Sequence, residues 1–208
     1  MEALILELSQ LMGPNANPAM FEDIFTDIAL IGKEHQDVGD HKLIHKALAE
    51  LRKALKMFLP YRKKRKVAIF GSSRVSDSHP NYKLALELAH GLTRHDYQVI
   101  TGAGGGIMEA ANQGAGRESS FGLNIKLPME QSANSFIDND PHLLEFKYFF
   151  TRKLVFIKES SATVLLPGGF GTLDEGFENL TLFQTGKCMP RPIILLDHKG
   201  DNYWDRWM

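Results

Sequence analysis

The stretch "ATVLLPGGFGTLDE", residues 162–175, passes from an apolar run through three closely spaced glycines into residues that favour a helix. A short apolar run with β-branched residues, bounded by proline and glycine, predicts a buried strand. Glycines are costly to order, so their concentration directly after a strand indicates a backbone that a ligand approaches closely. The stretch therefore predicts a strand, a glycine loop and a helix in immediate succession.

The chain from Lys66 onward repeats this alternation of short apolar runs and amphipathic segments. The expected strands comprise residues 66–70, 97–101, 121–126, 162–166 and 192–196. Their spacing is typical of βαβ units, in which helices connect parallel strands. We therefore expect an α/β domain with a parallel sheet over residues 61–208.

The first sixty residues differ, because their apolar side chains recur at helical spacing without glycine-rich turns. One stripe consists of Phe21, Ile24, Phe25, Ile28 and Ile31, and another of Ile44, Ala47, Leu48, Leu51, Leu55 and Phe58. We expect a helical N-terminal extension over residues 1–60.

The last residues, "YWDRWM" at 203–208, predict only the first turn or two of a helix. A parallel edge strand is normally covered by a longer helix. We therefore expect these 208 residues to be a shortened version of a longer protein.

The chain carries a net charge of −1 at pH 7 and a single cysteine, Cys188. A nearly neutral chain gives no reason to expect nucleic acid or an anionic membrane as a partner, and the basic run at residues 61–66 is interpreted as a solvated linker. One cysteine excludes an internal disulfide and suits a reducing compartment, and no apolar run is long enough to span a bilayer. The expected location is the cytoplasm.

Three of the expected strands end in glycine or small hydroxyl residues, within residues 70–74, 101–109 and 167–175. Ligands of open parallel sheets bind beyond the carboxyl ends of the strands, where helix N-termini present free N–H groups. The loops together predict an anion cradle, although each one taken singly is equally consistent with a tight turn. None has the dinucleotide spacing or a Walker sequence, so a mononucleotide or sugar phosphate fits better than NAD or a nucleoside triphosphate. The candidate cradle residues are Ser72, Gly104, Gly105, Gly168, Gly169, Gly171 and Thr172.

Five segments of the chain together resemble the LOG family, the cytokinin riboside 5'-monophosphate phosphoribohydrolases, whose members were often mislabelled lysine decarboxylases. The segments are "GSSR", "TGAGGGIMEAANQGA", "LPMEQSAN", "FFTRK" and "PGGFGTLDEGFENLTLFQTGK", and residues 167–175 match the family pattern P-G-G-x-G-T-x-x-E at every fixed position. The resemblance implies a Rossmann-like doubly wound sheet and a homodimer. It implies hydrolysis of the N-glycosidic bond of a nucleoside 5'-monophosphate, AMP or N6-modified AMP, with no metal or redox cofactor.

The resemblance assigns a catalytic role to Glu175 and Arg152. It assigns substrate binding to Glu130, Lys153, Thr181 and the loop at residues 168–174. The chemistry of the residues agrees, because cleaving a ribosyl bond develops positive charge on the sugar, which a carboxylate stabilises while it orients the attacking water.

The same residues have structural interpretations. Glu175 at the start of a helix complements the helix dipole. Arg152 and Lys153 are alternatively surface charges on a helix over residues 147–160. In that case the sheet is covered by the apolar side chains of Phe149, Leu154, Phe156 and Ile157.

Two other functions and a metal site are weighed against the hydrolase. A non-catalytic carrier of a nucleotide or phosphorylated cofactor uses the same cradle. Pyridoxal-dependent lysine decarboxylation is disfavoured because nothing resembles a Schiff-base lysine site. A metal at His41 and His45, four residues apart on an expected helix, is disfavoured because further ligands are not apparent. The sequence leaves open the base preference, the pathway and the role of the N-terminal helices.

Overall fold

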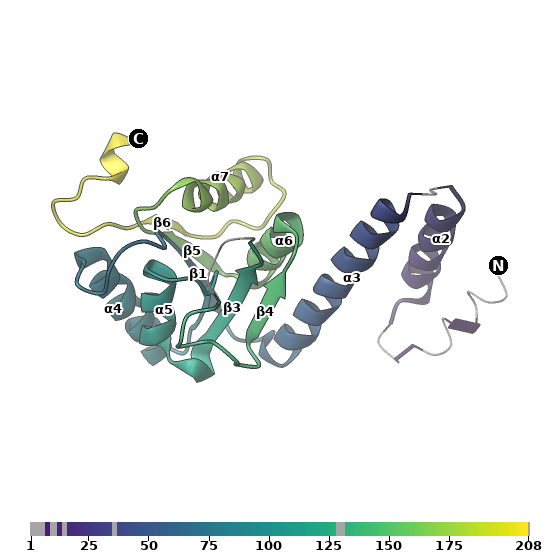
Figure 1. Cartoon of the computed structure of the whole chain (residues 1–208), viewed down its shortest axis with the longest axis horizontal. Coiled ribbons are helices and arrows are strands. Elements are labelled where there is room, and N and C mark those ends of the chain that lie inside the picture. Colours follow the sequence, from purple (N-terminus) through teal and green to yellow (C-terminus); the bar gives the residue numbers. More distant parts are fainter. Residues whose placement is uncertain (1–6, 9–11, 14–15, 35–36, 128–131, 208) are drawn as a thin grey trace. The chain divides into compact units, whose positions relative to one another are not determined.

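The computed structural model describes residues 7–8, 12–13, 16–34, 37–127 and 132–207. The chain divides into two compact units, Met1–Ala49 and Glu50–Met208. The first unit contains helix α2 (Pro18–Glu34) and the N-terminal part of helix α3 (Val38–Phe58) (Figure 1). Helix α2 has no buried residue, so its expected apolar stripe is not part of a core. The domain boundary expected at residue 60 stays a prediction, and the division between the compact units falls within α3.

The second unit is built on one sheet of six strands in the order β4-β3-β2-β1-β5-β6. The strands are β1 (Lys66–Phe70), β2 (Gln98–Thr101), β3 (Ser120–Ile125), β4 (Leu143–Phe146), β5 (Ala162–Leu165) and β6 (Ile193–Leu195). Every pairing is parallel. The expected α/β fold with a parallel sheet is thus confirmed.

Helices cover both faces of the sheet. Successive side chains of a strand point to opposite faces, so each strand contributes to the core on either side. Val67 and Ile69 pack in a core with helices α4 (Pro80–Arg94) and α5 (Ile107–Ala115). Ala68 and Phe70 pack in a second core with the C-terminal half of α3 and with helix α6 (Phe149–Glu159). Helix α7 (Phe170–Gln184) contacts this second core through Leu173 (Figure 1). The sheet is therefore doubly wound, as expected.

Strand β4 is the element that the sequence analysis missed. Its residues, "LLEF", were not among the expected strands, and the following helix was expected from residue 147 although α6 begins at Phe149. Strand β4 lies at the edge of the sheet, only Phe146 of its residues is buried, and Glu145 is exposed. It therefore lacks the continuous apolar run that identifies the central strands.

The connection from β4 to β5 creates the topological switch point of the sheet. The chain builds β1, β2, β3 and β4 outward in one direction, then returns through α6 to place β5 on the other side of β1. Ligands of doubly wound sheets bind at the carboxyl ends of the strands that flank such a point. The fold therefore directs attention to the loops after β1 and β5.

The chain's last described element is a short 3-10 helix, η3 (Trp204–Arg206), where the sequence predicts the first turns of a helix. Across the described residues, no helix combines the length and apolar character needed to cross a membrane.

Candidate active site

Three loops meet at the carboxyl edge of the sheet. The N–H of Ser72, after β1, donates to the carbonyl of Pro167, after β5, at 3.0 Å. The carbonyl of Ser72 in turn accepts from the N–H of Ile107, at the start of α5, at 3.0 Å. A Cβ added to Gly168 would lie 2.9 Å from the Ser72 nitrogen, so only glycine allows this approach. The structure thus brings together the loops that carry Ser72, Gly104, Gly105 and Gly168.

The loop after β2 is held by a buried network of amide and hydroxyl groups. The Oδ1 of Asn112 accepts from Thr101 Oγ1 at 2.8 Å and from Asn134 Nδ2 at 3.0 Å. Asn134 Nδ2 also donates to the carbonyl of Gly104 at 2.9 Å. The sequence analysis did not single out Asn112 or Asn134. The sequence offered one signal for this network: Asn112 stands among the apolar residues that α5 buries, and a buried polar side chain needs hydrogen-bond partners.

The loop after β5 leads directly into α7 and leaves open space beside two of its glycines, Gly169 and Gly171. Gly169 is the N-cap of α7, and a Cβ added to Gly169 or Gly171 would have no atom within 4 Å. Thr172 is buried in the first turn. The first N–H groups of a helix have no acceptor within the helix and carry partial positive charge. The N–H of Thr172 already donates to the carbonyl of Gly169 at 3.0 Å, so the N–H groups before it are the candidate donors to a phosphate.

Glu175 is buried one turn further along α7, with 1% of its surface exposed. Its Oε1 lies 3.4 Å from Nη2 of Arg152, and its Oε2 accepts no hydrogen bond from the described residues. Burial raises the pKa of Glu175, the positive charges of Arg152 and Lys153 oppose that rise, and Asp174 and Glu178 add to it. A buried acid with one unpartnered oxygen differs from a solvated acid that merely complements a helix dipole. Oε2 is itself buried, and no described residue donates a hydrogen bond to it.

Arg152 lies between the glycine loops and Glu175. Its guanidinium group lies 5.2 Å from the ring centre of Phe149 and 5.8 Å from that of Phe156, and its side chain is 11% exposed. A Cβ on Gly102 would lie 3.9 Å from Nη1 of Arg152, so this side chain also reaches the loop after β2. The surface-charge interpretation of Arg152 is therefore wrong. The expectation that Phe149 and Leu154 cover the sheet is wrong too, because both are about half exposed. Phe156 is buried as expected, together with Val155.

Lys153 is engaged by acids of α7. Its Nζ lies 2.7 Å from Asp174 Oδ1 and 3.3 Å from Glu178 Oε2. Burial lowers the pKa of Lys153, but the hydrogen bonds to Asp174 and Glu178 and the charges of Glu175 and Asp174 outweigh it, so the net direction is upward. Lys153 therefore ties α6 to α7 in this structure, and its expected contact with substrate stays a prediction.

Of the other expected substrate residues, one lies away from the cradle and one lies outside the described residues. Thr181 is exposed on α7, six residues beyond Glu175, which corresponds to roughly 9 Å along the helix axis. Glu130 lies outside the described residues. As for His41 and His45, no group of three or more potential metal-ligating side chains gathers within the part of the chain that the structure describes.

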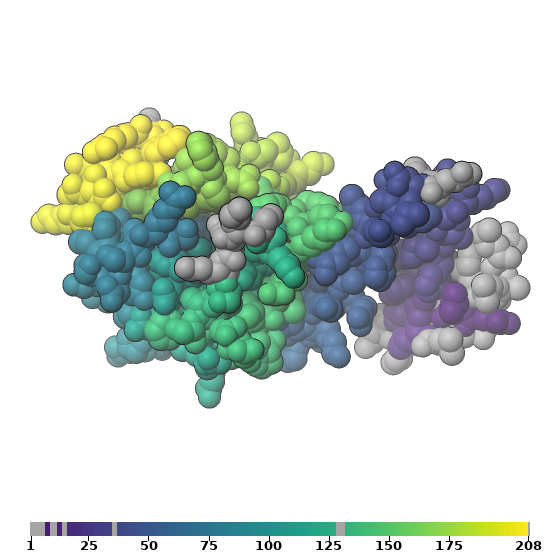
Figure 2. Space-filling view, in the orientation of Figure 1, coloured from purple at the N-terminus to yellow at the C-terminus, as the bar shows by residue number. Residues whose placement is uncertain are grey.

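An apolar groove lies beside α7 and has a cavity volume of about 230 Å³. It is lined by Leu165, Leu173, Gly176, Phe177, Leu180, Ile193, Leu195, Trp204 and Trp207. Figure 2 shows the C-terminal residues in yellow beside the yellow-green surface of α7. The groove shares no residue with the candidate cradle, and its apolar lining does not suit a phosphate.

Comparison with known proteins shows which family the chain belongs to. A family model described as "possible lysine decarboxylase" matches residues 108–208. A probable cytokinin riboside 5'-monophosphate phosphoribohydrolase, LOG6 of Arabidopsis thaliana, is 30% identical over 142 residues, which cover 67% of this chain and 68% of the relative. The chain belongs to the LOG family. A second member, LOG2 of Arabidopsis thaliana, is 27% identical over 141 residues, which cover 65% of this chain and 64% of that protein.

A solved structure, the Moco carrier protein from Chlamydomonas reinhardtii, is 21% identical with a TM-score of 0.48. The match covers 64% of this chain and 76% of that one. Within the LOG-family chain described here, Arg152 and the stretch from Gly168 to Glu175 fall inside the residues that the family model matches, whereas Ser72 and Gly104 precede them.

Proposed function

We propose that this chain hydrolyses the N-glycosidic bond of a nucleoside 5'-monophosphate, AMP or N6-modified AMP, to the free base and ribose 5-phosphate. The observation that carries the proposal is the buried Glu175, whose Oε2 accepts no hydrogen bond from the residues that the structure describes, one helical turn from an open glycine loop at a helix N-terminus. The names of the two curated relatives, both phosphoribohydrolases of a nucleoside 5'-monophosphate, support the same reaction.

In the proposed mechanism, the 5'-phosphate binds the N–H groups at the start of α7, which fixes the ribose beside Glu175. Cleavage of the bond between the base and C1' of the sugar develops positive charge on the ring, and the ionised Glu175 stabilises that charge. Oε2 accepts a proton from the attacking water, whose oxygen bonds to C1' as the bond from C1' to the base breaks. The departing base takes up a proton from solvent, and Glu175 afterwards returns its proton to solvent. Arg152 holds Oε1 and thereby keeps Glu175 ionised and oriented.

The test incubates the full chain with a panel of nucleoside 5'-monophosphates and the corresponding nucleosides, and measures free base by chromatography. We expect base release from AMP or N6-modified AMP and far less from the nucleosides, because only the monophosphates bind the cradle. Saturable binding of the monophosphates without base release would instead identify a carrier. Absence of both binding and base release would contradict the use of the cradle altogether.

We further propose that the chain works in the cytoplasm as a homodimer. Its single cysteine suits a reducing compartment.

The homodimer is argued from exposed apolar side chains. Helices α6 and α7, which are joined by the Lys153 ion pairs, carry several of them, namely Phe149, Phe150, Leu154, Phe177, Leu180 and Phe183. Grouped exposed apolar residues commonly mark contact surfaces between subunits. Equilibrium sedimentation should give twice the mass of one chain, and cell fractionation should recover the protein with soluble cytoplasmic markers; a monomer at micromolar concentration or a membrane-bound protein would contradict this.

A further inference from the structure

Glu50 is a buried acid in the C-terminal half of α3, within the second compact unit, and only 3% of its surface is exposed. Its Oε1 accepts a hydrogen bond from the backbone N–H of Lys147 at 2.7 Å, and its Oε2 accepts one from the hydroxyl of Thr151 at 2.6 Å. These partners are 97 and 101 residues away in the sequence. Burying a carboxylate is costly unless its oxygens are hydrogen-bonded, so this contact is a specific feature of the fold.

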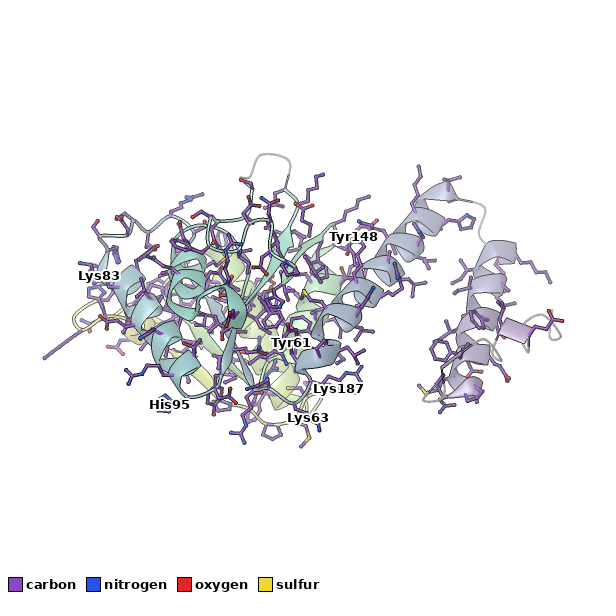
Figure 3. All side chains as sticks on the ribbon, turned by 90° about the horizontal axis from the view of Figure 1, so that it is seen from below. Tyr61, Lys63, Lys83, His95, Tyr148 and Lys187 are labelled. Atoms are coloured by element: carbon purple, nitrogen blue, oxygen red, sulfur yellow. The ribbon has the colours of Figure 1, made fainter. Side chains whose placement is uncertain are left out.

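The two partners of Glu50 bracket the junction between β4 and α6. Strand β4 ends at Phe146, and α6 begins at Phe149. The N-cap residue of α6, Tyr148, which Figure 3 labels, makes no side-chain capping bond. Glu50 therefore places a negative charge beside the N-terminus of α6 and binds the chain on both sides of the N-cap, at the N–H of Lys147 and at the hydroxyl of Thr151.

The half of α3 that carries Glu50 is itself firmly held. Ala54 and Phe58, one and two turns further along the helix, are each 1% exposed and belong to the core that also contains Val155 and Phe156 of α6. The ring of Phe58 packs against that of Phe121 at 4.8 Å between centres. The Glu50 carboxylate is thus presented to α6 by a rigid element, as a positioning group requires.

Arg152 follows Thr151 directly in the first turn of α6. The hydroxyl of Thr151 has a single proton, which it donates to Oε2 of Glu50 at 2.6 Å while its oxygen also lies 2.9 Å from the carbonyl oxygen of Tyr148. Glu50 therefore holds this turn at two points, the hydroxyl of Thr151 and the N–H of Lys147. From the same turn, the guanidinium group of Arg152 reaches Oε1 of Glu175 at 3.4 Å. A displacement of the turn would move the guanidinium group away from the acid.

We infer that Glu50 is a positioning residue for the site: by holding the start of α6, it sets the distance between Arg152 and Glu175. The inference deepens the proposed function and rests on it in so far as the pair acts in catalysis. Glu50 precedes residues 108–208, to which the family model is matched, so the positioning contact comes from a part of the chain that this model does not include.

The test compares Glu50→Gln and Thr151→Val with the control Glu159→Gln. The first variant removes the charge of Glu50 at nearly constant volume, and the second removes the hydroxyl that donates to it. Glu159, the last residue of α6, is a partly buried acid whose side chain is 7% exposed, and it pairs with Lys66 and Lys158. Substituting Glu159 removes an acidic charge from the C-terminal end of α6, whereas Arg152 lies in the first turn of that helix.

The readouts are kcat and KM for AMP, the acid limb of the pH profile, and the pKa of Glu175 by carbon-13 NMR. We expect Glu50→Gln to lower kcat by about ten- to hundred-fold with a smaller change in KM, because misplacement of a catalytic group acts mainly on the chemical step. The pKa of Glu175 should rise further, since the positive charges of Arg152 and Lys153, both carried by α6, lower it, while Asp174 and Glu178 on α7 stay in place and raise it. Thr151→Val should change both quantities in the same direction.

The inference is overturned if Glu50→Gln and Thr151→Val match Glu159→Gln in kcat and in the pKa of Glu175, once activity is normalised to the folded fraction measured by circular dichroism. A wild-type chain that releases no base would contradict the proposed function on its own. The pKa of Glu175 would then still test the positioning role of Glu50, because an unchanged value in the variants excludes a displacement of Arg152. If Glu50→Gln does not fold, Thr151→Val decides the outcome alone.

Discussion

Replacing Glu175 by glutamine should lower kcat/KM for base release from AMP by about 10²- to 10⁴-fold, the usual contribution of a group that activates water and stabilises charge at the reacting centre. Glutamine has nearly the same shape but cannot ionise, so it can neither accept a proton from water nor stabilise positive charge on the ribose. Binding of AMP, measured by calorimetry, should change little, because the phosphate contacts lie in the glycine loop. The matched control is Glu178→Gln, on the same helix but with a side chain 40% exposed, which should change kcat/KM less than about threefold.

The same substitution should make the protein more stable at neutral pH. The pKa of Glu175 is raised mainly by burial, so the folded state binds more protons than the unfolded state between the ordinary value of about 4.5 and the raised value. The free energy of unfolding of the wild type therefore falls as the pH rises through that window, whereas Glu175→Gln has no such loss. Thermal unfolding should show a higher Tm for the variant above the window and equal values below pH 4.5.

The catalytic activity of the wild type should rise as the pH rises through the same window, because the ionised form of Glu175 is the active one. The acid limb of kcat for the wild type should lie above the range of an ordinary glutamate. If Glu175→Gln keeps wild-type turnover, Glu175 is not the catalytic acid. If Glu175→Gln is less stable than the wild type at pH 7, burial does not raise the pKa of Glu175 as described.

Much of the fold was predictable because local pattern and global architecture agree. Strands β1 and β5 are continuous apolar runs followed by glycine, and parallel sheets bury such strands on both faces. Their carboxyl ends meet at one edge in any parallel sheet, so the meeting of Ser72 with Gly168 follows once the strands are identified. Strand β4 escaped because an edge strand with an exposed glutamate has no such run.

The contacts within the site were less predictable, since they depend on which side chains face one another. Lys153 and Arg152 are adjacent in sequence, yet one pairs with Asp174 and Glu178 and the other contacts Glu175. Which of two neighbouring cations reaches a buried acid depends on the rotation of α6 about its axis. That rotation is set by Phe156 in the core and by the distant Glu50, and no local signal in the sequence reports it.

Substituting the glycines of the loop after β5 by alanine should separate the structural need for glycine from the functional one. Gly168→Ala should lower the free energy of unfolding by about 1–3 kcal/mol, because the new Cβ would overlap Thr172 Oγ1 and lie 2.9 Å from the Ser72 nitrogen. Gly169→Ala and Gly171→Ala should unfold close to the wild-type Tm, since a Cβ at either position has no atom within 4 Å and neither glycine has a positive φ. Thermal unfolding of the three variants measures this difference.

The two well-folded variants then report on the ligand. If the open space beside Gly169 and Gly171 receives the phosphate, a methyl group there blocks the approach of its oxygens to the helix N-terminus, and charge-assisted hydrogen bonds worth about 1.5–3 kcal/mol are weakened. We therefore expect KM for AMP to rise about ten- to hundred-fold in at least one of these variants, while the slow reaction of adenosine, which has no phosphate, stays unchanged. Equal losses on AMP and adenosine would indicate a general disturbance of the site. Unchanged affinity for AMP in both variants, with Tm preserved, would show that the phosphate does not bind at the start of α7, and the role of Glu175 beside the ribose would have to be abandoned with it.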